Sequence, residues 1–319
     1  MKAAVLHAYG TIPRYEDFPD PVPANEQQVL INVHAASIKQ IDKSRAAGRH
    51  YTTYASLPAV VGLDGAGILE DGTKVYAGGI TGMMAEKALI LKDSAVVLPG
   101  NIDLETAAAL PNPLLGADAA LMYKSGFKKG DTVLINGATG VSGKLAVQVA
   151  KYRGAAVVIA TGRNAATLEQ LKTLGADEII SLQQTDEAII SRLKQVHQHT
   201  PVDIVLDYLW AHPMELILAA FKTLPPHKIK IVTIGEMAGA SIHLASGILR
   251  STQIELIGSG IGSISIADIT AYMKSVLPEM FQLAAAGKLK LDIETAALKD
   301  VESAWQKDAG AGKRMVIKI

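Results

Sequence analysis

The run of small residues at 136–143 carries the clearest chemical signal in the sequence. The apolar stretch Thr132–Ile135 leads into Asn-Gly-Ala-Thr-Gly-Val-Ser-Gly, and a helix-forming stretch follows. Ala138, Gly140 and Gly143 hold the three small-residue positions of the dinucleotide-binding fingerprint, which need a tight turn, close backbone approach to a pyrophosphate and close helix–strand packing. Since a helix N-terminus offers unpaired N–H groups and partial positive charge, the turn predicts a diphosphate site. Its expected contacts are Ala138, Thr139, Gly140, Val141 and Ser142.

A glycine-rich turn on its own also occurs between strands and helices that bind nothing. Here the strand, turn and helix follow in the required order at the head of an alternating series of strands and helices, which favours the binding interpretation.

The end of the next predicted strand indicates which dinucleotide to expect. An acid about 20 residues after the glycine turn would bind the ribose 2′-hydroxyl of NAD. This chain has Thr161-Gly162-Arg163-Asn164 there, with no carboxylate to repel a 2′-phosphate and a guanidinium to bind one. The segment therefore predicts NADPH as the cofactor, with contacts from Thr161, Gly162, Arg163 and Asn164. The alternative is that Arg163 is a solvated residue ahead of a helix.

Several residues follow other predicted strands at their carboxyl ends, where open α/β sheets bind ligands. Tyr208 follows the strand 203–207, and Ile234, Gly235 and Met237 follow the strand 229–234. These four residues are predicted cofactor contacts. Asn112, near the predicted domain boundary, is a further candidate.

Composition excludes other chemistries. There is no cysteine, which removes disulfides, thiol catalysis and thiolate zinc sites. Charges balance at 31 of each sign, so nucleic acid is a poor candidate partner. The eight histidines lack metal-ligand spacing, and Ser142 lacks the flanking glycines of a hydrolase nucleophile. No apolar run of about 18 residues predicts a membrane span, and a cytoplasmic location is expected.

The order of elements predicts two domains in 319 residues. Residues 1–110 read as short strands broken by Pro and Gly, whereas 131–260 alternate six short apolar strands with helices, which predicts a parallel sheet covered on both faces. A helix over 266–286 and a final strand over 315–319 follow. The prediction is an α/β protein in which a Rossmann domain, 111–264, is inserted in a β-rich domain made of 1–110 and 265–319.

The chain resembles the zinc-independent quinone oxidoreductase (zeta-crystallin-like) branch of the medium-chain dehydrogenases and reductases, over nearly its whole length. That resemblance implies a GroES-like β domain and a homodimer. The matching segments are 1–4, 33–42, 61–67, 108–111, 136–143, 174–177, 202–207 and 312–313.

Zinc alcohol dehydrogenases of the same superfamily have a catalytic Cys at the position of Lys39 and a His-Glu pair at Leu63-Asp64. Lys39 and Leu63 cannot serve as those ligands, so no metal is expected. The quinone reductases often have Asn at the place of Lys39, and a Pro or aromatic residue near Gln40. The substrate end of the site is therefore left open.

The resemblance also suggests how the chain would work. We expect hydride transfer from NADPH to a quinone or an α,β-unsaturated carbonyl between the domains, where protein groups stabilise charge on the substrate oxygen. Lys39 and Gln40 are the candidate polar groups, and Tyr51 and Tyr54 could stack on a flat ring. The resemblance places Ser259 close to the nicotinamide.

Each assignment has an alternative: Lys39 could pair with Asp42 or Asp64 and hold the fold, and the tyrosines could be surface cover. The chain could also bind NADPH without turnover, as a redox sensor or structural protein. A third possibility is an enone or enoyl-thioester reductase.

Overall fold

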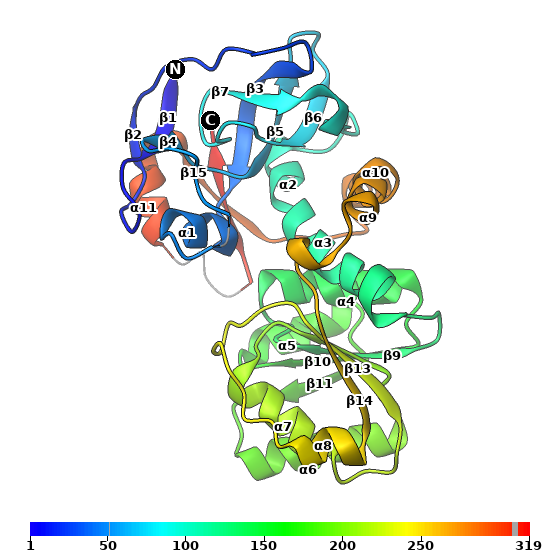
Figure 1. The fold of residues 1–319 in the computed structure, drawn as a ribbon. Coiled ribbons are helices and arrows are strands. Elements are labelled where there is room, and N and C mark those ends of the chain that lie inside the picture. Colours follow the sequence, from blue (N-terminus) through cyan, green and yellow to red (C-terminus); the bar gives the residue numbers. More distant parts are fainter. Residues whose placement is uncertain (51, 308–311) are drawn as a thin grey trace. The chain divides into compact units, whose positions relative to one another are not determined.

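The computed structural model describes residues 1–50, 52–307 and 312–319, and the chain divides into two compact units. Unit 1 comprises Met1–Pro111 and Thr270–Ile319, and unit 2 comprises Asn112–Ile269. The predicted boundaries lay at residues 110 and 265. Figure 1 follows the chain from blue to red through these elements.

Unit 2 is built on a six-stranded parallel sheet with strand order β11-β10-β9-β12-β13-β14. In chain order its strands are β9 Thr132–Asn136, β10 Val157–Gly162, β11 Glu178–Ser181, β12 Ile204–Asp207, β13 Lys228–Thr233 and β14 Gln253–Gly258. This is the strand order of doubly wound folds. Successive strands are added on one side of β9 up to β11, and then on its other side from β12 to β14. The sheet confirms the predicted Rossmann domain.

The helices that pack around this sheet are α4 Val141–Arg153, α5 Ala165–Thr173, α6 Asp186–His199, α7 Ala211–Phe221 and α8 Ser246–Ser251. Two more helices, α3 Pro111–Ala119 and α9 Ile266–Ala271, lie at the ends of unit 2 in the sequence. Helix α4 lies on one side of the sheet, and α6 packs beside α7 on the other (Figure 1). The apolar sides of β9, β12 and β13 pack with α6 and α7 into one core, in which Leu134, Val205, Met214, Ile217 and Ile231 are buried.

Unit 1 is β-rich, as predicted. A seven-stranded sheet joins β15, β16, β3, β5, β6 and β8 in that order, with β7 paired to β3, and a smaller sheet joins β2, β1 and β4. The strands are β1 Lys2–Leu6, β2 Arg14–Asp17, β3 Gln28–Ser37, β4 Ala59–Val60, β5 Asp64–Leu69, β6 Lys74–Gly78, β7 Lys87–Leu91, β8 Val96–Val97, β15 Ile293–Ala297 and β16 Arg314–Lys318. The helices are α1 Gln40–Ala46, α2 Leu104–Ala109, α10 Leu277–Ala285 and α11 Val301–Gln306.

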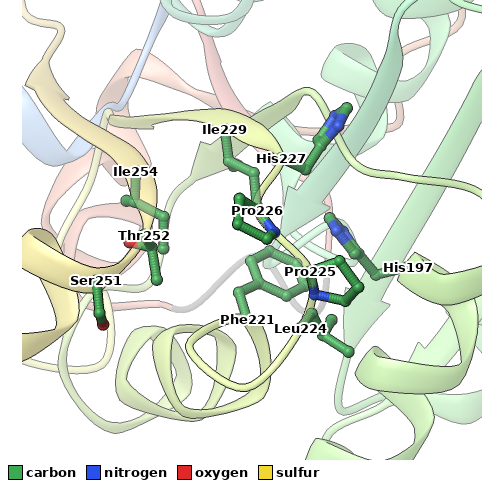
Figure 2. A pocket seen from close by; sticks show the side chains of 10 residues that line it. All are labelled: His197, Phe221, Leu224, Pro225, Pro226, His227, Ile229, Ser251, Thr252 and Ile254. Carbon is green, nitrogen blue, oxygen red and sulfur yellow. The ribbon is translucent and has the colours of Figure 1, made fainter.

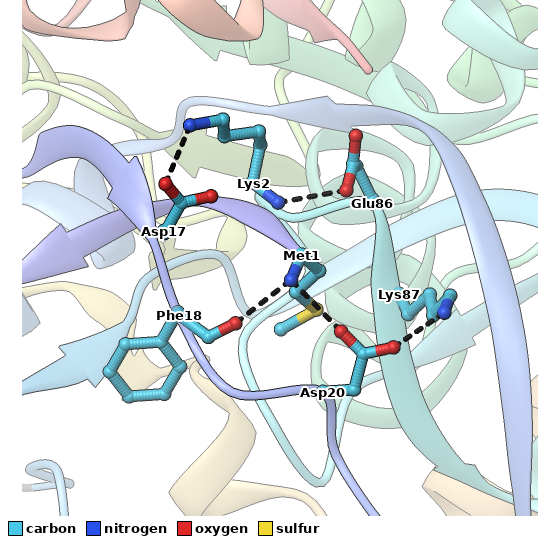
Figure 3. Close-up of polar contacts among 7 residues, drawn as sticks. All are labelled: Met1, Lys2, Asp17, Phe18, Asp20, Glu86 and Lys87. Carbon is cyan, nitrogen blue, oxygen red and sulfur yellow. Dashed lines mark hydrogen bonds and ion pairs between the residues drawn. The ribbon is translucent and has the colours of Figure 1, made fainter.

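Polar contacts fix the first strand of unit 1 in place. The amino group of Met1 donates to Phe18 O at 3.0 Å and to Asp20 Oδ1 at 2.9 Å, and Lys2 N donates to a Glu86 carboxylate oxygen (Figure 3). Lys87 also pairs with Asp20. Strand β1 is thereby held against both β2 and the segment that precedes β7.

The final strand completes unit 1 from the far end of the chain. β16 pairs antiparallel with β3, with Val316 opposite Ser37, and parallel with β15. Residues 28–37 and 314–318 therefore share one sheet although unit 2 lies between them in the sequence.

Pro111 and Pro113 lie in the first turn of α3, because proline fits the first turn of a helix, where the N–H is unpaired in any case. One predicted element differs from the structure. The predicted helix 266–286 is α9 and α10 joined by a π-helical turn at Tyr272–Val276. No helix in the described ranges combines the length and apolar character needed to cross a membrane.

Candidate functional site

The glycine turn of unit 2 joins β9 to α4. Gly137 has φ +92°, so the left-handed residue of the turn is Gly137, one place before Ala138, which the sequence pattern assigned to the tight turn. A Cβ on Gly143 would lie 2.4 Å from Gly137 O, so only glycine lets the helix approach the turn this closely. At Gly140, the N-cap of α4, a Cβ would meet no atom nearer than 3.7 Å. The exposed backbone at Gly140 is therefore open to a ligand.

The carboxyl ends of the strands meet in register beside this turn. Asn136 of β9 lies opposite Thr161 of β10 and opposite Asp207 of β12. Asp207 lies opposite Thr233 of β13, which in turn lies opposite Gly258 of β14. The sheet thus brings most of the predicted cofactor residues to one edge, namely those at 138–142, 161–164, 208, 234–237 and 259.

A buried polar chain lies at this edge. Sequence reasoning assigned one of its members, Thr161, to the cofactor but gave Asn136 and Asp207 no role. Asn136 Nδ2 donates to Asp207 Oδ1 at 2.7 Å, Thr161 Oγ1 donates to Asn136 Oδ1 at 2.7 Å, and Gly137 N donates to Thr161 Oγ1 at 3.3 Å. Asn136, Thr161 and Asp207 have no exposed surface. The available signal was a polar residue at the end of each of three apolar strands, or one residue before it.

The Asp207 carboxylate is held by neutral donors. Besides Asn136, it accepts from Leu209 N at 3.0 Å and from Trp210 N at 3.1 Å. Burial raises the pKa of Asp207 above its ordinary range, and these three donors act against that rise. The carboxylate therefore organises both the end of β9 and the start of the segment after β12.

Arg163 stands between β10 and α5. Its side chain is exposed, and it forms no ion pair within the part of the chain that the structure describes. The next residue, Asn164, caps α5 by accepting from Thr167 N at 2.8 Å. A permanently charged guanidinium group is therefore free at the place where the 2′-hydroxyl or 2′-phosphate of a dinucleotide is expected.

The remaining predicted cofactor residues differ in exposure. Tyr208 is buried and its hydroxyl lacks a hydrogen-bond partner among the described residues. A Cβ on Gly235 would lie 2.9 Å from Tyr208 O, so glycine lets these two loops pack closely. Met237 is exposed, Ile234 is half-buried and Ser259 is buried. Asn112 is half-buried in α3, and its role stays a prediction.

Unit 1 holds Lys39 at the N-cap of α1, with its side chain fully buried. The Lys39 ammonium donates to Ser37 O at 2.9 Å and to Asp64 Oδ1 at 3.0 Å, and lies 3.2 Å from Asp42 Oδ2. Burial lowers the pKa of Lys39, but the two carboxylates raise it by more, so the net change is upward and the ammonium stays charged. These contacts match the structural alternative considered for Lys39.

Asp42 connects this ion cluster to the backbone around it. It accepts from Lys39 N at 3.0 Å and from Leu63 N at 2.9 Å, which ties the start of α1 to the segment before β5. Gln40, the first residue of α1, is exposed. Of the two polar residues predicted to act on substrate, Gln40 is the one that faces solvent.

Tyr54 is half-buried, with the Arg45 guanidinium 4.6 Å from the centre of its ring. Burial raises the pKa of Tyr54 to about 12, so it stays a neutral phenol. Its hydroxyl has no partner among the residues described. Tyr51, the other predicted ring-stacking residue, lies outside the described residues.

A small pocket in unit 2 lies at the opposite end of the strands, where β13 and β14 begin. Figure 2 shows its lining, with His197 near Phe221 and with His227 beside the start of β13. The pocket borders the amino ends of β13 and β14, whereas ligands of open α/β sheets bind at the carboxyl ends. It is therefore not the cofactor site. In the described ranges, no three His, Asp or Glu side chains gather as a metal-binding group.

Comparison with known proteins agrees with this architecture. Residues 142–282 match the family model described as zinc-binding dehydrogenase. A probable NADPH-dependent quinone reductase of Emericella nidulans is 28% identical over 99% of both chains. The chloroplastic NADPH-dependent alkenal/one oxidoreductase of Arabidopsis thaliana is 33% identical over 59% of this chain and 54% of its own length.

Among solved structures, the quinone oxidoreductase of Pseudomonas syringae superposes with a TM-score of 0.83 and 25% identity, covering 100% of this chain and 99% of that one. Similarity over the full length, in sequence and in fold, agrees with the residues that carried the resemblance. The chain is therefore similar, in sequence and in fold, to quinone oxidoreductases of the medium-chain dehydrogenase/reductase type.

Proposed function

We propose that this protein is an NADPH-dependent oxidoreductase that transfers hydride to a quinone or an α,β-unsaturated carbonyl. The observation that carries the proposal is the carboxyl edge of unit 2, where the open backbone at Gly140 and the unpaired Arg163 lie at the ends of adjacent strands. A backbone nest for a diphosphate and a separate cation for a 2′-phosphate together fit NADPH better than NADH.

The residues at this edge have the chemistry that the cofactor needs. Val141 and Ser142, in the first turn of α4, offer N–H groups to the diphosphate, and Arg163 offers charge-assisted hydrogen bonds. When bound, NADPH supplies the hydride. The proposed cofactor contacts are Asn112, Ala138, Thr139, Gly140, Val141, Ser142, Thr161, Gly162, Arg163, Asn164, Tyr208, Ile234, Gly235, Met237 and Ser259.

On the substrate side, Gln40 is the proposed donor to the substrate oxygen, because it is exposed at the first turn of α1. The contacts of Lys39 support a positioning role, since its ammonium is fully buried and already bound to two carboxylates. Tyr54 and Tyr51 are proposed to bind the flat ring of the substrate.

The proposed reaction needs no zinc. Lys39 and Leu63 stand where the zinc dehydrogenases have ligands, and the chain has no cysteine to supply a thiolate. A cationic Lys39 would also repel a second cation placed in the same cluster.

We also propose a homodimer. Strand β14 is the edge of the six-stranded sheet, and its free side is suited to pairing with the same strand of a second copy. Light scattering on the purified protein gives the mass directly: twice the chain mass is expected, and a monomer would contradict this part of the proposal. A cytoplasmic location stays a prediction.

One experiment tests the main proposal. The purified protein is titrated with NADPH and with NADH, and NADPH oxidation is then followed with a benzoquinone, a naphthoquinone, an alkenal and an enoyl thioester. Tighter NADPH binding with turnover of a quinone or alkenal is the expected result. Preference for the thioester would favour the enoyl-thioester reductase, binding without turnover would favour a redox sensor, and absence of binding would refute the assignment.

A further inference from the structure

We propose that Asp207, Asn136 and Thr161 form a positioning relay that sets the shape of the glycine turn and thereby the affinity for NADPH. The inference rests on the proposed cofactor. Asn136 and Asp207 are not among its proposed contacts, and Thr161, which is, acts in the relay through the bonds of its buried Oγ1 to Asn136 and Gly137. The three side chains come from β12, β9 and β10, three adjacent strands of the sheet, and each ends its strand or lies one residue before the end.

The relay has one direction, because each member uses a specific donor and acceptor. Asp207 Oδ1 accepts from Asn136 Nδ2 at 2.7 Å, which fixes the amide so that Asn136 Oδ1 faces Thr161. That oxygen then accepts from Thr161 Oγ1 at 2.7 Å. With its proton committed to Asn136, Thr161 Oγ1 presents a lone pair to Gly137 N at 3.3 Å.

The relay ends on the residue that makes the turn. Gly137 has φ +92°, and the following residue is held as well, since Ala138 N donates to Thr161 O at 2.7 Å. The turn then delivers Gly140 and the first N–H groups of α4 to the ligand. A shift at Gly137 would therefore move every backbone donor of the proposed diphosphate site.

Burial makes the relay stiff. Asn136, Thr161 and Asp207 have no exposed surface, so water cannot replace a lost partner at low cost. The Asp207 carboxylate also binds Leu209 N and Trp210 N, and Leu209 packs against Gly137, where a Cβ would lie 2.9 Å from the leucine side chain. The same carboxylate thus fixes the turn from two sides.

The test uses Thr161→Val, which keeps the shape of the side chain and removes both hydrogen bonds of Oγ1. We expect its dissociation constant for NADPH to rise about tenfold, while kcat at saturating NADPH changes much less. Thr161→Ser restores the hydroxyl and should return the dissociation constant close to that of the wild type. Thr132→Val is the matched control, because Thr132 is buried at the opposite end of β9 and should leave NADPH binding unchanged.

A second variant, at a residue that is not a proposed cofactor contact, separates the relay from a direct contact between Thr161 and NADPH. Asn136→Leu breaks the relay at its centre and should weaken NADPH binding at least as much as Thr161→Val. The double variant should bind no more weakly than Asn136→Leu alone, since both changes interrupt one chain of bonds.

The outcomes separate the inference from the proposed function. If the wild-type protein fails to bind NADPH, the proposed function fails. If it binds, and Thr161→Val lowers the melting temperature without changing the dissociation constant, or the two changes act additively on binding, the relay is only structural and the inference is overturned.

Discussion

At the scale of single residues, Arg163 should determine the preference for NADPH, which has a 2′-phosphate, over NADH, which lacks one. Charge-assisted hydrogen bonds contribute about 1.5–3 kcal/mol, so Arg163→Ala should reduce the preference for NADPH over NADH by roughly 10- to 100-fold. Binding of NADH should change little. Parallel titrations with both cofactors measure this ratio.

Lys172→Ala supplies the control for Arg163, since Lys172 is an exposed cation on the helix that follows Arg163. It should leave the cofactor ratio unchanged. An equal loss of NADH and NADPH affinity in Arg163→Ala would instead mean that Arg163 contacts a part common to both cofactors.

Lys39 offers a second test at this scale, because its structural and catalytic roles predict different results. Lys39→Met leaves Asp42 and Asp64 buried without the ammonium that contacts them, which should cost about 3–5 kcal/mol of unfolding free energy in urea. Adding Asp64→Asn removes one of the two buried carboxylates that have lost their ammonium partner, and should recover part of the lost unfolding free energy. If both variants keep wild-type stability but lose kcat, Lys39 acts on the substrate and the positioning role is wrong.

At the scale of elements, the segment between β12 and α7 has an unusual backbone. Trp210 has φ 57° and ψ −156°, a region that glycine occupies easily and that strains other residues by about 1–3 kcal/mol. Trp210→Gly should therefore be more stable than Trp210→Ala by about 1 kcal/mol, although both variants lose the indole equally.

The opposite order is expected at an ordinary helix position. Glu169 lies inside α5, where Gly in place of Ala costs about 0.5–1 kcal/mol, so Glu169→Ala should be more stable than Glu169→Gly. Thermal unfolding of the four variants makes the comparison. Equal stability of the two Trp210 variants would show that the backbone at 210 is not strained.

Elements with strong local signals were predictable from the sequence. The predicted order of strand, glycine turn and helix is that of β9 and α4, because Thr132–Ile135 is a short apolar run and Gly140 precedes a helix-forming stretch. β15 was missed, because Ile-Glu-Thr-Ala-Ala has little strand propensity of its own and depends on pairing with β16.

The candidate site was also predictable only in part. The glycine turn and Arg163 could be found from spacing, since a backbone nest and a lone cation are visible in the sequence. The Asn136–Asp207 contact could not, because the two residues are 71 positions apart and meet only when β9 and β12 pair.

At the scale of the whole molecule, His197 makes stability depend on pH. Burial, followed by the neighbouring His227, lowers the pKa of His197 from 6.5 to about 4, and its Nδ1 accepts from Val202 N at 3.1 Å. As pH falls below 6.5 the unfolded chain gains this proton first, so the free energy of unfolding should decrease toward pH 4. The slope contributed by this residue is at most about 1.4 kcal/mol per pH unit.

His197→Asn keeps an acceptor for Val202 N and removes the titration, so it should flatten the decrease seen in urea unfolding at a series of pH values. His212→Asn, at an exposed position, should leave the decrease almost intact. An unchanged pH profile in His197→Asn would contradict the assignment.

The insertion of unit 2 within unit 1 has a consequence for synthesis on the ribosome. All strands of the six-stranded sheet lie before residue 259, so this sheet can form while the last segment is still within the exit tunnel. Residues 35–37 of β3 pair with β16, and this side of β3 stays open until β16 emerges. The first part of unit 1 to be translated is thus among the last to be completed, and nascent chains arrested before residue 314 should present an unpaired stretch of β3 to chaperones beside a finished nucleotide-binding domain.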